Sequence, residues 1–248
     1  MEPVYYETRP TEHLTPYISA YWVSKGFYRD TVMFPVFADG CCDIIYDRTE
    51  HIAKMVGTGA ELAHVPLNGR VDMAGIRFRP GGFTALTGIP AGVIADGTFL
   101  SDILEKGLAE YISKQFETAT TEGFDRIFSC LINNLNPLIA FWLSESFAGI
   151  GDISDYFKCS EKTVNRAFLA HTGVSPVRMI AVKRFRYALE FVLSEKKSMT
   201  EIAYDSGYCD QSHFIKDFRR FAGTRPSDFL RYKDSLGVRF IQFPSGCL

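Results

Sequence analysis

The sequence predicts an α+β N-terminal domain, a small sheet or partial barrel capped by helices, followed by an all-α domain of two helix-turn-helix units joined by a long helix. Three observations predict this architecture: strand-like segments gather in the first third of the chain, a repeat fills the last third, and charge is divided unevenly between the two parts. We place the domain bounds at residues 1–150 and 151–234, with a C-terminal tail at 235–248.

The composition excludes several classes of protein. A chain of 248 residues with 46% hydrophobic residues is too apolar to be mainly disordered and is long enough for two cores. It lacks the run of ~18 apolar residues that a membrane-spanning helix needs, and its acidic start is unlike a signal peptide, so we expect a cytoplasmic protein without a membrane partner. Its 6 cysteines form no Cys-x-x-Cys pair, so we expect reduced thiols, no metal site and no cofactor.

The net charge of −2 conceals an asymmetry along the chain. Residues 1–151 hold 11 Lys/Arg and 18 Asp/Glu, whereas residues 152–234 hold 15 Lys/Arg and 11 Asp/Glu. The basic C-terminal part is suited to meet a polyanion, although a basic surface that only faces water has the same composition. The charge therefore needs the support of a motif.

Polar, apolar, glycine and proline positions recur near the C-terminus at a constant spacing of 50 residues. The first copy is Ser160, Val164, Phe168, Gly173 and Pro176, and the second is Asp210, Phe214, Phe218, Gly223 and Pro226. In each copy a polar N-cap precedes apolar residues four apart, and a glycine follows at a C-cap position. The repeat predicts two amphipathic helices of about three turns each.

A shorter helical segment precedes each repeated helix. In the second copy Ser198 and Glu201 form a capping box, and Ser206-Gly207-Tyr208 ends the helix. In the first copy the helix is expected at Asp152 to Lys158, and its turn contains no glycine. Because such helix pairs are also ordinary packing elements, one copy alone would not indicate a function.

A long helix is predicted between the two copies. Ser175 and Pro176 suit its N-cap and first position, and apolar residues keep a helical period to about Ser194. The segment Pro176–Glu195 has 20 residues and, as a helix, would be about 30 Å long. Successive major-groove openings on one face of B-DNA are ~34 Å apart, so this helix has the length to place both short helices on one face of a duplex.

With these features the region from about Ile153 to Arg231 resembles the DNA-binding domain of AraC/XylS-type transcription regulators. The most specific stretch is Ile202-Ala203, Gly207-Tyr208, Asp210-Gln211-Ser212, Phe214, Phe218, Gly223 and Pro226. The resemblance implies seven helices, with Glu161–His171 and Gln211–Phe221 as recognition helices. Two residues depart from the family pattern: Phe157 stands in the first turn, where small residues are common, and Arg225 precedes Pro226, where a hydroxyl cap is usual.

Helical geometry separates candidate DNA-reading residues from core residues. With the apolar repeat positions facing inward, the outer side presents Lys162, Asn165 and Arg166 on the first helix and Gln211, Ser212, His213 and Lys216 on the second. Arg, Lys, Asn and Gln can hydrogen-bond base edges, and by the resemblance the second set matches base-contacting positions, so we expect these residues to contact double-stranded DNA. We expect Arg219, Arg220 and Arg225 to bind phosphates, and the alternative for each residue is a solvated surface position.

The acidic N-terminal part has strand-like segments separated by Gly, Pro, Asp or Asn. They are residues 18–23, 32–37, 42–46, 55–57 and 71–78. Beyond Pro80, apolar residues at helical spacing predict helical structure within Phe99–Phe116 and Phe124–Phe147. The glycines at 149 and 151 predict a short hinge at the end of this domain.

Aromatic residues on these strands allow two interpretations. In the first, Tyr21, Trp22, Phe34, Phe37 and Tyr46 enclose a pocket for a small-molecule effector, and Arg77 or Arg79 with the turn Gly81-Gly82 anchors an anionic or polar ligand. In the second, the aromatic residues fill the core and Arg77 pairs with an acidic neighbour such as Asp43 or Asp72. Our candidate effector-binding residues are Trp22, Tyr46, Arg77 and Arg79.

The N-terminal part also resembles an uncharacterised domain often found ahead of AraC-type DNA-binding domains, over about Arg9 to Asp102. The residues that carry this resemblance are Pro16-Tyr17, Tyr21-Trp22, Asp39-Gly40-Cys41 with Asp43, and the run from Gly75 to Gly82. Ala38 departs from it, because a proline is common before Asp-Gly-Cys. The resemblance implies a regulatory or dimerising role and no established ligand.

Together these features predict a sequence-specific DNA-binding transcription regulator and not an enzyme. A small effector or self-association as a homodimer would control it, and RNA polymerase is a further partner if it is an activator. Two alternatives are a DNA-targeted thiol enzyme of the alkyl-accepting type, which would use Cys41-Cys42, and an effector-free architectural DNA-binding protein. In the tail, Val238–Phe243 would either pair as an edge strand or lie on the surface.

Overall fold

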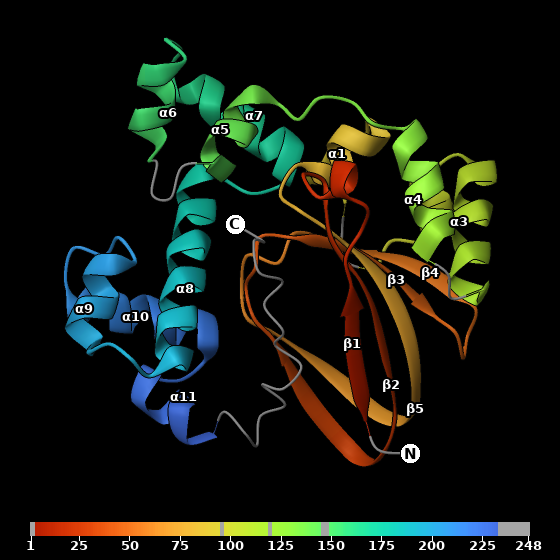
Figure 1. The fold of residues 1–248 in the computed structure, drawn as a ribbon, viewed down its shortest axis with the longest axis horizontal. Helices are drawn as coiled ribbons and strands as arrows, with labels where there is room; N and C mark the ends of the chain where they lie inside the picture. The colour runs from red at the N-terminus through yellow and green to blue at the C-terminus, as the bar shows by residue number, and fades with distance from the viewer. Residues whose placement is uncertain (1–2, 95–96, 119–120, 145–148, 233–248) are drawn as a thin grey trace.

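The computed structural model describes residues 3–94, 97–118, 121–144 and 149–232. An antiparallel sheet forms the N-terminal part, and a group of helices lies beside it at the C-terminal end of the described chain (Figure 1). The predicted fold class, an α+β domain followed by helix-turn-helix units joined by a long helix, is confirmed. No helix in the described ranges is both long and apolar enough to cross a membrane. The predicted tail segment Val238–Phe243 lies outside the described residues.

Within the described residues, five antiparallel strands make the sheet, in the order β1-β2-β5-β3-β4. They are β1 (Val4–Thr8), β2 (Ile18–Val36), β3 (Cys42–Asp47), β4 (Ile52–Val56) and β5 (Ala63–Phe78). The predicted strands at 42–46, 55–57 and 71–78 correspond to β3, β4 and β5. Strand β1 is additional, and the two strands expected at 18–23 and 32–37 are parts of the single strand β2.

Strand β2 is continuous because β5 pairs with it from one end to the other. The register runs from Ile18 opposite Phe78 to Val36 opposite Ala63, with an irregularity between Tyr28 and Val32. Residues 24–31 look like a connection in the sequence because they are mostly polar or glycine. In the structure they lie where much of the strand surface is exposed, so polar side chains cost little there.

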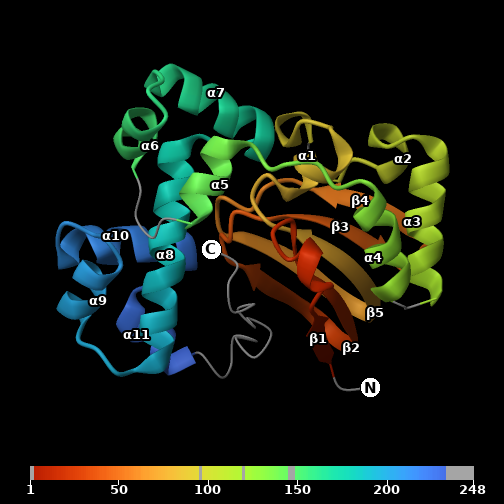
Figure 2. The same ribbon diagram turned by 45° about the horizontal axis from the view of Figure 1, so that its top comes forward.

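Helices cover one face of the sheet (Figure 2). They are α1 (Gly82–Thr87), α2 (Leu100–Ile103), α3 (Lys106–Thr118) and α4 (Thr121–Cys130), with short 3-10 helices η1 (Glu12–Leu14) and η2 (Ala91–Val93). Buried Phe116, Phe124 and Phe128 pack here against strand residues such as Ile44 and Ile76. This cluster is the core of the N-terminal domain.

The helical segment expected at Phe124–Phe147 is divided in two. Helix α4 ends at Cys130, and helix α5 (Pro137–Ser144) begins after a capping residue, because the Asn136 side chain accepts a hydrogen bond from the amide of Leu138 at 3.0 Å. Proline cannot continue a preceding helix but suits the first position of a new one.

Helix α5 packs with the C-terminal helices. Its Ile139 and Trp142 are fully buried in a cluster with Ile153, Val164 and Phe168. The glycines expected to form a hinge belong to the start of α6 (Ile150–Tyr156), where Gly149 is the N-cap and Gly151 lies inside the helix. Core packing therefore groups α5 with the C-terminal domain.

The remaining helices agree closely with the sequence prediction. They are α7 (Glu161–Thr172), α8 (Pro176–Ser194), α9 (Met199–Asp205), α10 (Gln211–Ala222) and α11 (Pro226–Tyr232). Both predicted recognition helices and the long joining helix are correct to within one residue at each end. The region of the family resemblance, about Ile153 to Arg231, contains the six helices α6 to α11, and the count of seven that the resemblance implies is reached only with α5, which precedes this region.

Candidate nucleic-acid interface and effector pocket

The helix pairs α6–α7 and α9–α10 have similar turns. A backbone amide closes each turn onto the preceding helix, from Cys159 to the carbonyl of Ser154 at 3.0 Å and from Tyr208 to that of Ala203 at 2.9 Å. In the second turn Gly207 has a left-handed φ of 76°, and in the first Lys158 holds this place with a φ of 51°. A side chain in this conformation costs about 1 kcal/mol, so the first turn is the more strained of the two.

The helices α7 and α10 begin and end in the same way. Side chains of Ser160 and Asp210 cap their N-termini by accepting hydrogen bonds from the third helical amide. Gly173 and Gly223 end them with left-handed φ values of 76° and 74°. From residue 161 to 170, every residue is buried, half-buried or exposed like its counterpart 50 positions later. The repeat therefore specifies not only two helices but also the same pattern of exposure on each.

The outward face of α7 carries the first predicted set of DNA-reading residues. Lys162 and Arg166 are exposed and Asn165 is half-buried, on the side opposite the buried Val164 and Phe168. Arginine and lysine side chains exposed near the start of such a helix have the reach to meet base edges or phosphates.

A broad depression of about 670 Å³ borders α10 and gathers most of the second predicted set. Its lining includes Gln211, Ser212, Lys216, Arg219 and Arg225. The three basic side chains give this depression a positive charge. A positively charged concave surface beside an exposed helix suits the phosphate backbone of a duplex.

Two residues predicted to bind DNA at α10 have other partners. The His213 ring packs edge-on against Tyr208 with centroids 5.2 Å apart, and its Nε2 lies 3.6 Å from Asp217. Arg220 forms an ion pair with Glu61 of the N-terminal domain at 3.4 Å. Neither residue lines the depression that holds Lys216 and Arg219.

Two basic residues of the long helix α8, Lys183 and Arg178, bind groups of the protein itself. Lys183 is 2% exposed, and its Nζ donates a hydrogen bond to the carbonyl oxygen of Trp142 at 2.6 Å. Because carbonyls at a helix C-terminus lack helical donors, this lysine satisfies the end of α5. Arg178 donates from Nε to the carbonyl of Ala60 at 2.9 Å and also pairs with Glu61.

The N-terminal domain contacts both helix-turn-helix units. At the first unit, Thr84 donates to the carbonyl of His171 at 3.1 Å, and η2 packs so closely that a Cβ added at Gly92 would lie 2.5 Å from the Leu169 carbonyl oxygen. At the second, Glu61 lies between Arg178 and Arg220, and these arginines lower the pKa of its carboxyl. The N-terminal domain therefore contacts both helix-turn-helix units that contain the predicted recognition helices.

The face of the sheet opposite α3 and α4 contains a cavity of about 210 Å³. Aromatic side chains of Tyr5, Trp22, Tyr28 and Phe34 line it, together with aliphatic residues of β3, β4 and β5. The Trp22 indole lies directly over Gly75, where any Cβ would overlap its ring at 2.2 Å. Of the predicted effector-binding residues, the structure brings Trp22 and Arg77 to this cavity.

The other two predicted effector-binding residues lie elsewhere. Tyr46 lies on the helix-covered face, where its hydroxyl hydrogen-bonds Glu117 and its ring stacks on Phe116 with centroids 5.3 Å apart. Arg79 follows β5 and is not part of the cavity lining. Successive residues of a strand face opposite sides of a sheet, so Tyr46 and its neighbour Ile45 cannot share one pocket. Tyr21 and Phe37 are likewise buried in other clusters.

Acidic residues surround Arg77 at the edge of the cavity. Its guanidinium lies 3.2 Å from Glu7, 3.6 Å from Asp39 and 3.4 Å from Asp43. The sequence-based alternative in which Arg77 pairs with Asp43 therefore agrees with the structure. The indole of Trp22 also donates to Asp43, at 2.7 Å. Burial raises the pKa of Asp43 to about 6, against the opposing effect of Arg77.

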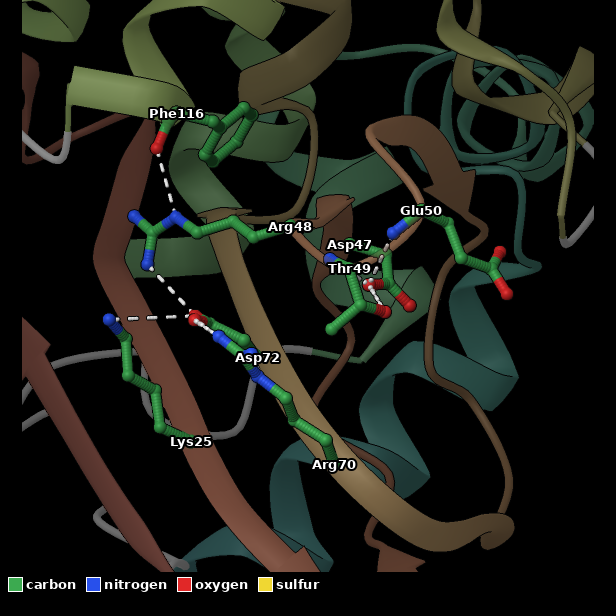
Figure 3. Close-up of polar contacts among 8 residues, drawn as sticks. All are labelled: Lys25, Asp47, Arg48, Thr49, Glu50, Arg70, Asp72 and Phe116. Carbon is green, nitrogen blue, oxygen red and sulfur yellow. Dashed lines mark hydrogen bonds and ion pairs between the residues drawn. The ribbon is translucent and has the colours of Figure 1, made fainter.

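Asp72, the other acidic partner considered for Arg77, lies on the opposite face of β5. It is surrounded by Lys25 at 3.5 Å, Arg48 at 3.4 Å and Arg70 at 3.9 Å (Figure 3). Arg48 also donates to the carbonyl of Phe116 at 3.0 Å, which ties the sheet to α3. All of these contacts join residues of the protein itself, so we interpret the cluster as stabilising the fold.

Sequence reasoning missed four residues of the cavity region: Tyr5, Glu7, Tyr28 and Asp39. Tyr5 and Glu7 alternate with exposed residues along β1, but the sequence Val-Tyr-Tyr-Glu-Thr does not alternate between apolar and polar residues, so it gave no period-two signal for a strand. In the sequence, Asp39 is notable only as part of the Asp39-Gly40-Cys41 motif. Its position beside the cavity depends on its ion pair with Arg77 of β5, which is distant in the chain.

The two adjacent cysteines are buried. Burial, with help from Asp43 and Asp39, raises the pKa of the Cys42 thiol, whereas a nucleophilic cysteine needs the thiolate. No group of three or more His, Cys, Asp or Glu with the geometry of a metal site occurs in the part of the chain that the structure describes. These observations give no support to the thiol-enzyme alternative.

Comparison with known proteins defines the class of each domain. Residues 153–232 match a family described as "Helix-turn-helix domain", and residues 6–99 match a family described as "Domain of unknown function (DUF6597)". Residues 153–232 are therefore a helix-turn-helix domain, in agreement with the resemblance to AraC/XylS-type regulators, and a region that matches the second family precedes it.

Curated relatives match the same C-terminal region. The HTH-type transcriptional activator RhaS of Escherichia fergusonii is 35% identical over 104 residues, which are 41% of this chain and 37% of RhaS. RhaS of Salmonella schwarzengrund is 34% identical over 105 residues, with the same shares of both chains. The match thus spans little more than a third of each relative's length.

Two solved structures are similar to parts of this chain. The DNA-binding domain of AdpA in complex with a target DNA has a TM-score of 0.36 and 21% identity, over 43% of this chain and 95% of that one. Unsaturated fatty acid-bound ToxT from Vibrio cholerae has a TM-score of 0.40 and 14% identity, over 84% of this chain and 93% of that one.

Proposed function

We propose that this protein is a sequence-specific DNA-binding transcription regulator in which α7 and α10 enter successive major grooves on one face of a duplex. The observation that carries the proposal is the repeated outward face, which has the same pattern of exposure on both helices. The joining helix α8 has 19 residues and a length of about 28 Å, close to the ~34 Å between groove openings.

The basic and polar residues near α7 and α10 have two roles, base reading and phosphate binding. We assign base reading to Lys162, Asn165 and Arg166 on α7 and to Gln211, Ser212 and Lys216 on α10, and phosphate binding to Arg219 and Arg225. His213 contributes less to DNA binding, because its ring already contacts Tyr208 and Asp217. Arg220 becomes available to DNA when its ion pair with Glu61 opens.

The N-terminal domain acts as the regulatory part, through its contacts with α7, α8 and α10. A small effector, a homodimer contact, or both would change how firmly these contacts hold the two units. RNA polymerase is a partner if the protein is an activator, as the RhaS proteins are described to be. We assign the chain no enzymatic activity and a cytoplasmic location.

Selection of bound fragments from genomic DNA, with the full chain as bait, would test this function. We expect one recurrent site whose affinity falls steeply with salt, because displaced counterions accompany phosphate contacts. Arg166→Ala should cost about 1–3 kcal/mol on that site and relax preference at one base pair. Arg219→Ala should weaken all sequences about equally and reduce the salt dependence.

A matched control and a clear negative outcome complete the experiment. Lys114 is exposed on α3, far from the DNA-reading helices in the sequence, so Lys114→Ala should leave DNA affinity unchanged. Binding that is absent at low salt, or equal losses of specificity from Arg166→Ala and Lys114→Ala, would contradict the proposed function.

A further inference from the structure

The cavity on the open face of the sheet has the walls of a binding site for a cation. Four aromatic rings line it, from Tyr5 and Trp22 at one end to Tyr28 and Phe34 at the other. The faces of such rings carry partial negative charge and attract ammonium or guanidinium groups. Apolar residues such as Leu67 and Met73 complete the lining, so an occupant must also have an apolar part.

The charged groups at one edge of this cavity are unbalanced. Glu7, Asp39 and Asp43 all converge on Arg77, which places three carboxylates around one guanidinium. Their side chains are 9% to 14% exposed, so water screens them poorly. Asp43 and Arg77 also line the cavity itself. The local excess of negative charge would oppose an anionic ligand, in contrast to the role that the sequence suggested for Arg77.

We propose that this cavity binds a small organic cation, an amine or quaternary ammonium compound with an aromatic or aliphatic body. Its charged group lies beside the Asp43 carboxylate where that residue lines the cavity, and it balances the carboxylates. Its apolar body lies along β5 towards Tyr28 and Leu67. A hydrated metal ion lacks the apolar surface to fill this space, and a neutral hydrocarbon leaves the charge unbalanced.

The cavity wall continues into the contact with the C-terminal helices. Phe34 and Val36 line the cavity, and the next residues, Phe37 and Ala38, belong to the core that contains Phe229 of α11. The Phe37 and Phe229 rings meet edge to face with centroids 5.7 Å apart. If the chain regulates transcription as proposed above, the cation is its effector, and this segment couples the site to DNA binding.

Isothermal titration calorimetry on the full chain, without DNA, tests the site by itself. The probe is benzyltrimethylammonium, and the comparison ligands are benzyl alcohol, which is neutral, and phenylacetate, which is an anion. We expect the cation to bind at least tenfold more tightly than either, a difference of about 1.4 kcal/mol. No binding of the cation at millimolar concentration, or equal or tighter binding of phenylacetate, would overturn the proposal.

Two variants locate the binding site. Asp43→Asn should weaken benzyltrimethylammonium about tenfold and leave benzyl alcohol unchanged, because only the charge is removed. Tyr28→Leu tests the aromatic wall at the far end, and it should weaken the cation severalfold even if Asp43→Asn fails to fold. Glu122→Gln is the matched control, an exposed acid on α4 over the other face of the sheet, and should change nothing. Equal affinities in all three variants would contradict the assignment.

The pH dependence gives a further readout. Asp43 faces Arg77 on β5, Tyr5 on β1, Trp22 on β2 and Asp39 in the loop before β3, and Glu7 of β1 lies on the same Arg77 guanidinium. Because the pKa of Asp43 is about 6, the cation should bind more tightly as pH rises from 5 to 7, and Asp43→Asn should remove most of this change. A pH-independent affinity in the parent protein would contradict a role for Asp43.

The outcomes separate this inference from the proposed function. Calorimetry without DNA reports only the cavity, so a failure here leaves DNA binding by α7 and α10 untouched. Conversely, a protein that binds the cation but no DNA would retain the site and lose the regulatory role. Where both hold, the cation should change affinity for the selected site, and Asp43→Asn should suppress that change.

Discussion

The two helix-turn-helix units have the same interior but different surroundings. Both bury equivalent residues, such as Phe168 and Phe218, and both end their second helix at a left-handed glycine. The first unit completes its core with Trp142 of α5. The second completes its core with α11 and with Phe37 and Ala38 of the N-terminal domain. The repeat thus fixes the shape of each unit, and neighbours outside the repeat determine how each is held.

The outward faces differ in charge as well. Arg219 and Arg220 on α10 correspond to Leu169 and Ala170 on α7, at the end of each helix. The last turn of α7 instead meets η2, with Gly92 against the Leu169 carbonyl. This end of α7 therefore contacts the N-terminal domain through its backbone, whereas this end of α10 contacts it through the ion pair of Arg220 with Glu61 and also carries Arg219, for which we propose phosphate binding.

The largest expected difference is in stability, between two isolated C-terminal fragments that begin at different residues. A fragment of residues 136–232 retains Trp142, whereas a fragment of residues 151–232 loses it and exposes the core of the first unit. Loss of a buried tryptophan side chain costs about 3–5 kcal/mol, so we expect only the longer fragment to fold completely. Thermal unfolding and salt-dependent DNA binding of both fragments check this. Equal stability would show that α5 is not part of this domain.

The close contact at Gly92 offers a way to loosen the first unit alone. Gly92→Ala forces η2 away from the Leu169 carbonyl, because the added Cβ would lie at 2.5 Å. We expect a loss of about 1–3 kcal/mol in unfolding free energy, with faster amide exchange in α7 than in α10. Gly107→Ala is the control, since nothing lies within 4 Å of the added atom. Equal changes in amide exchange in α7 and α10 would mean that the contact with the N-terminal domain stabilises both helices to the same extent.

The ion pairs of Glu61 offer the corresponding change at the second unit. Glu61→Gln should release Arg220 for phosphate contact and raise DNA affinity by roughly two- to fivefold, the range expected of exposed ion pairs. The gain should shrink at high salt, which screens both the pair and the phosphate contact. Fluorescence anisotropy with the selected DNA site measures this. An unchanged DNA affinity would show that Glu61 has no part in regulating DNA binding.

The smallest expected effect concerns the two turns. Lys158→Gly places in the first turn the residue type that Gly207 provides in the second, and it should stabilise the first unit by about 0.5–1 kcal/mol. Gly207→Ala should destabilise the second unit by a similar amount. Urea unfolding of the full chain and the 136–232 fragment measures both changes. A destabilising Lys158→Gly would show that the lysine side chain makes contacts that outweigh its backbone strain.

Local signals along the chain were enough to predict the C-terminal domain. The capping residues Ser160, Ser175, Ser198 and Asp210 each accept the hydrogen bond that the sequence implied. Helix caps and helical periodicity act within a few residues, so they can be read without knowing the fold. The same locality explains why the bounds of α7, α8 and α10 were predicted so closely.

The sheet depends on contacts between distant residues, and here prediction was weaker. Residues 24–31 form part of β2 only because β5 supplies hydrogen-bond partners from a distant part of the chain. The structure does not bring Trp22 and Tyr46 to one cavity, because they lie on opposite faces of the sheet. A side chain's face depends on strand register, and register is fixed by pairing rather than by local sequence.

Sequence patterns were sufficient to predict the two repeated helices, their caps, the long helix between them and the residues on their outward faces. The burial of Lys183 beneath α5, the pairing of Arg220 with Glu61 and the three carboxylates around Arg77 follow only from the folded structure. These two groups of features depend on interactions of different range along the chain. Hydrogen bonds within a helix join residues four apart, whereas burial and charge balance depend on residues brought together from the whole chain.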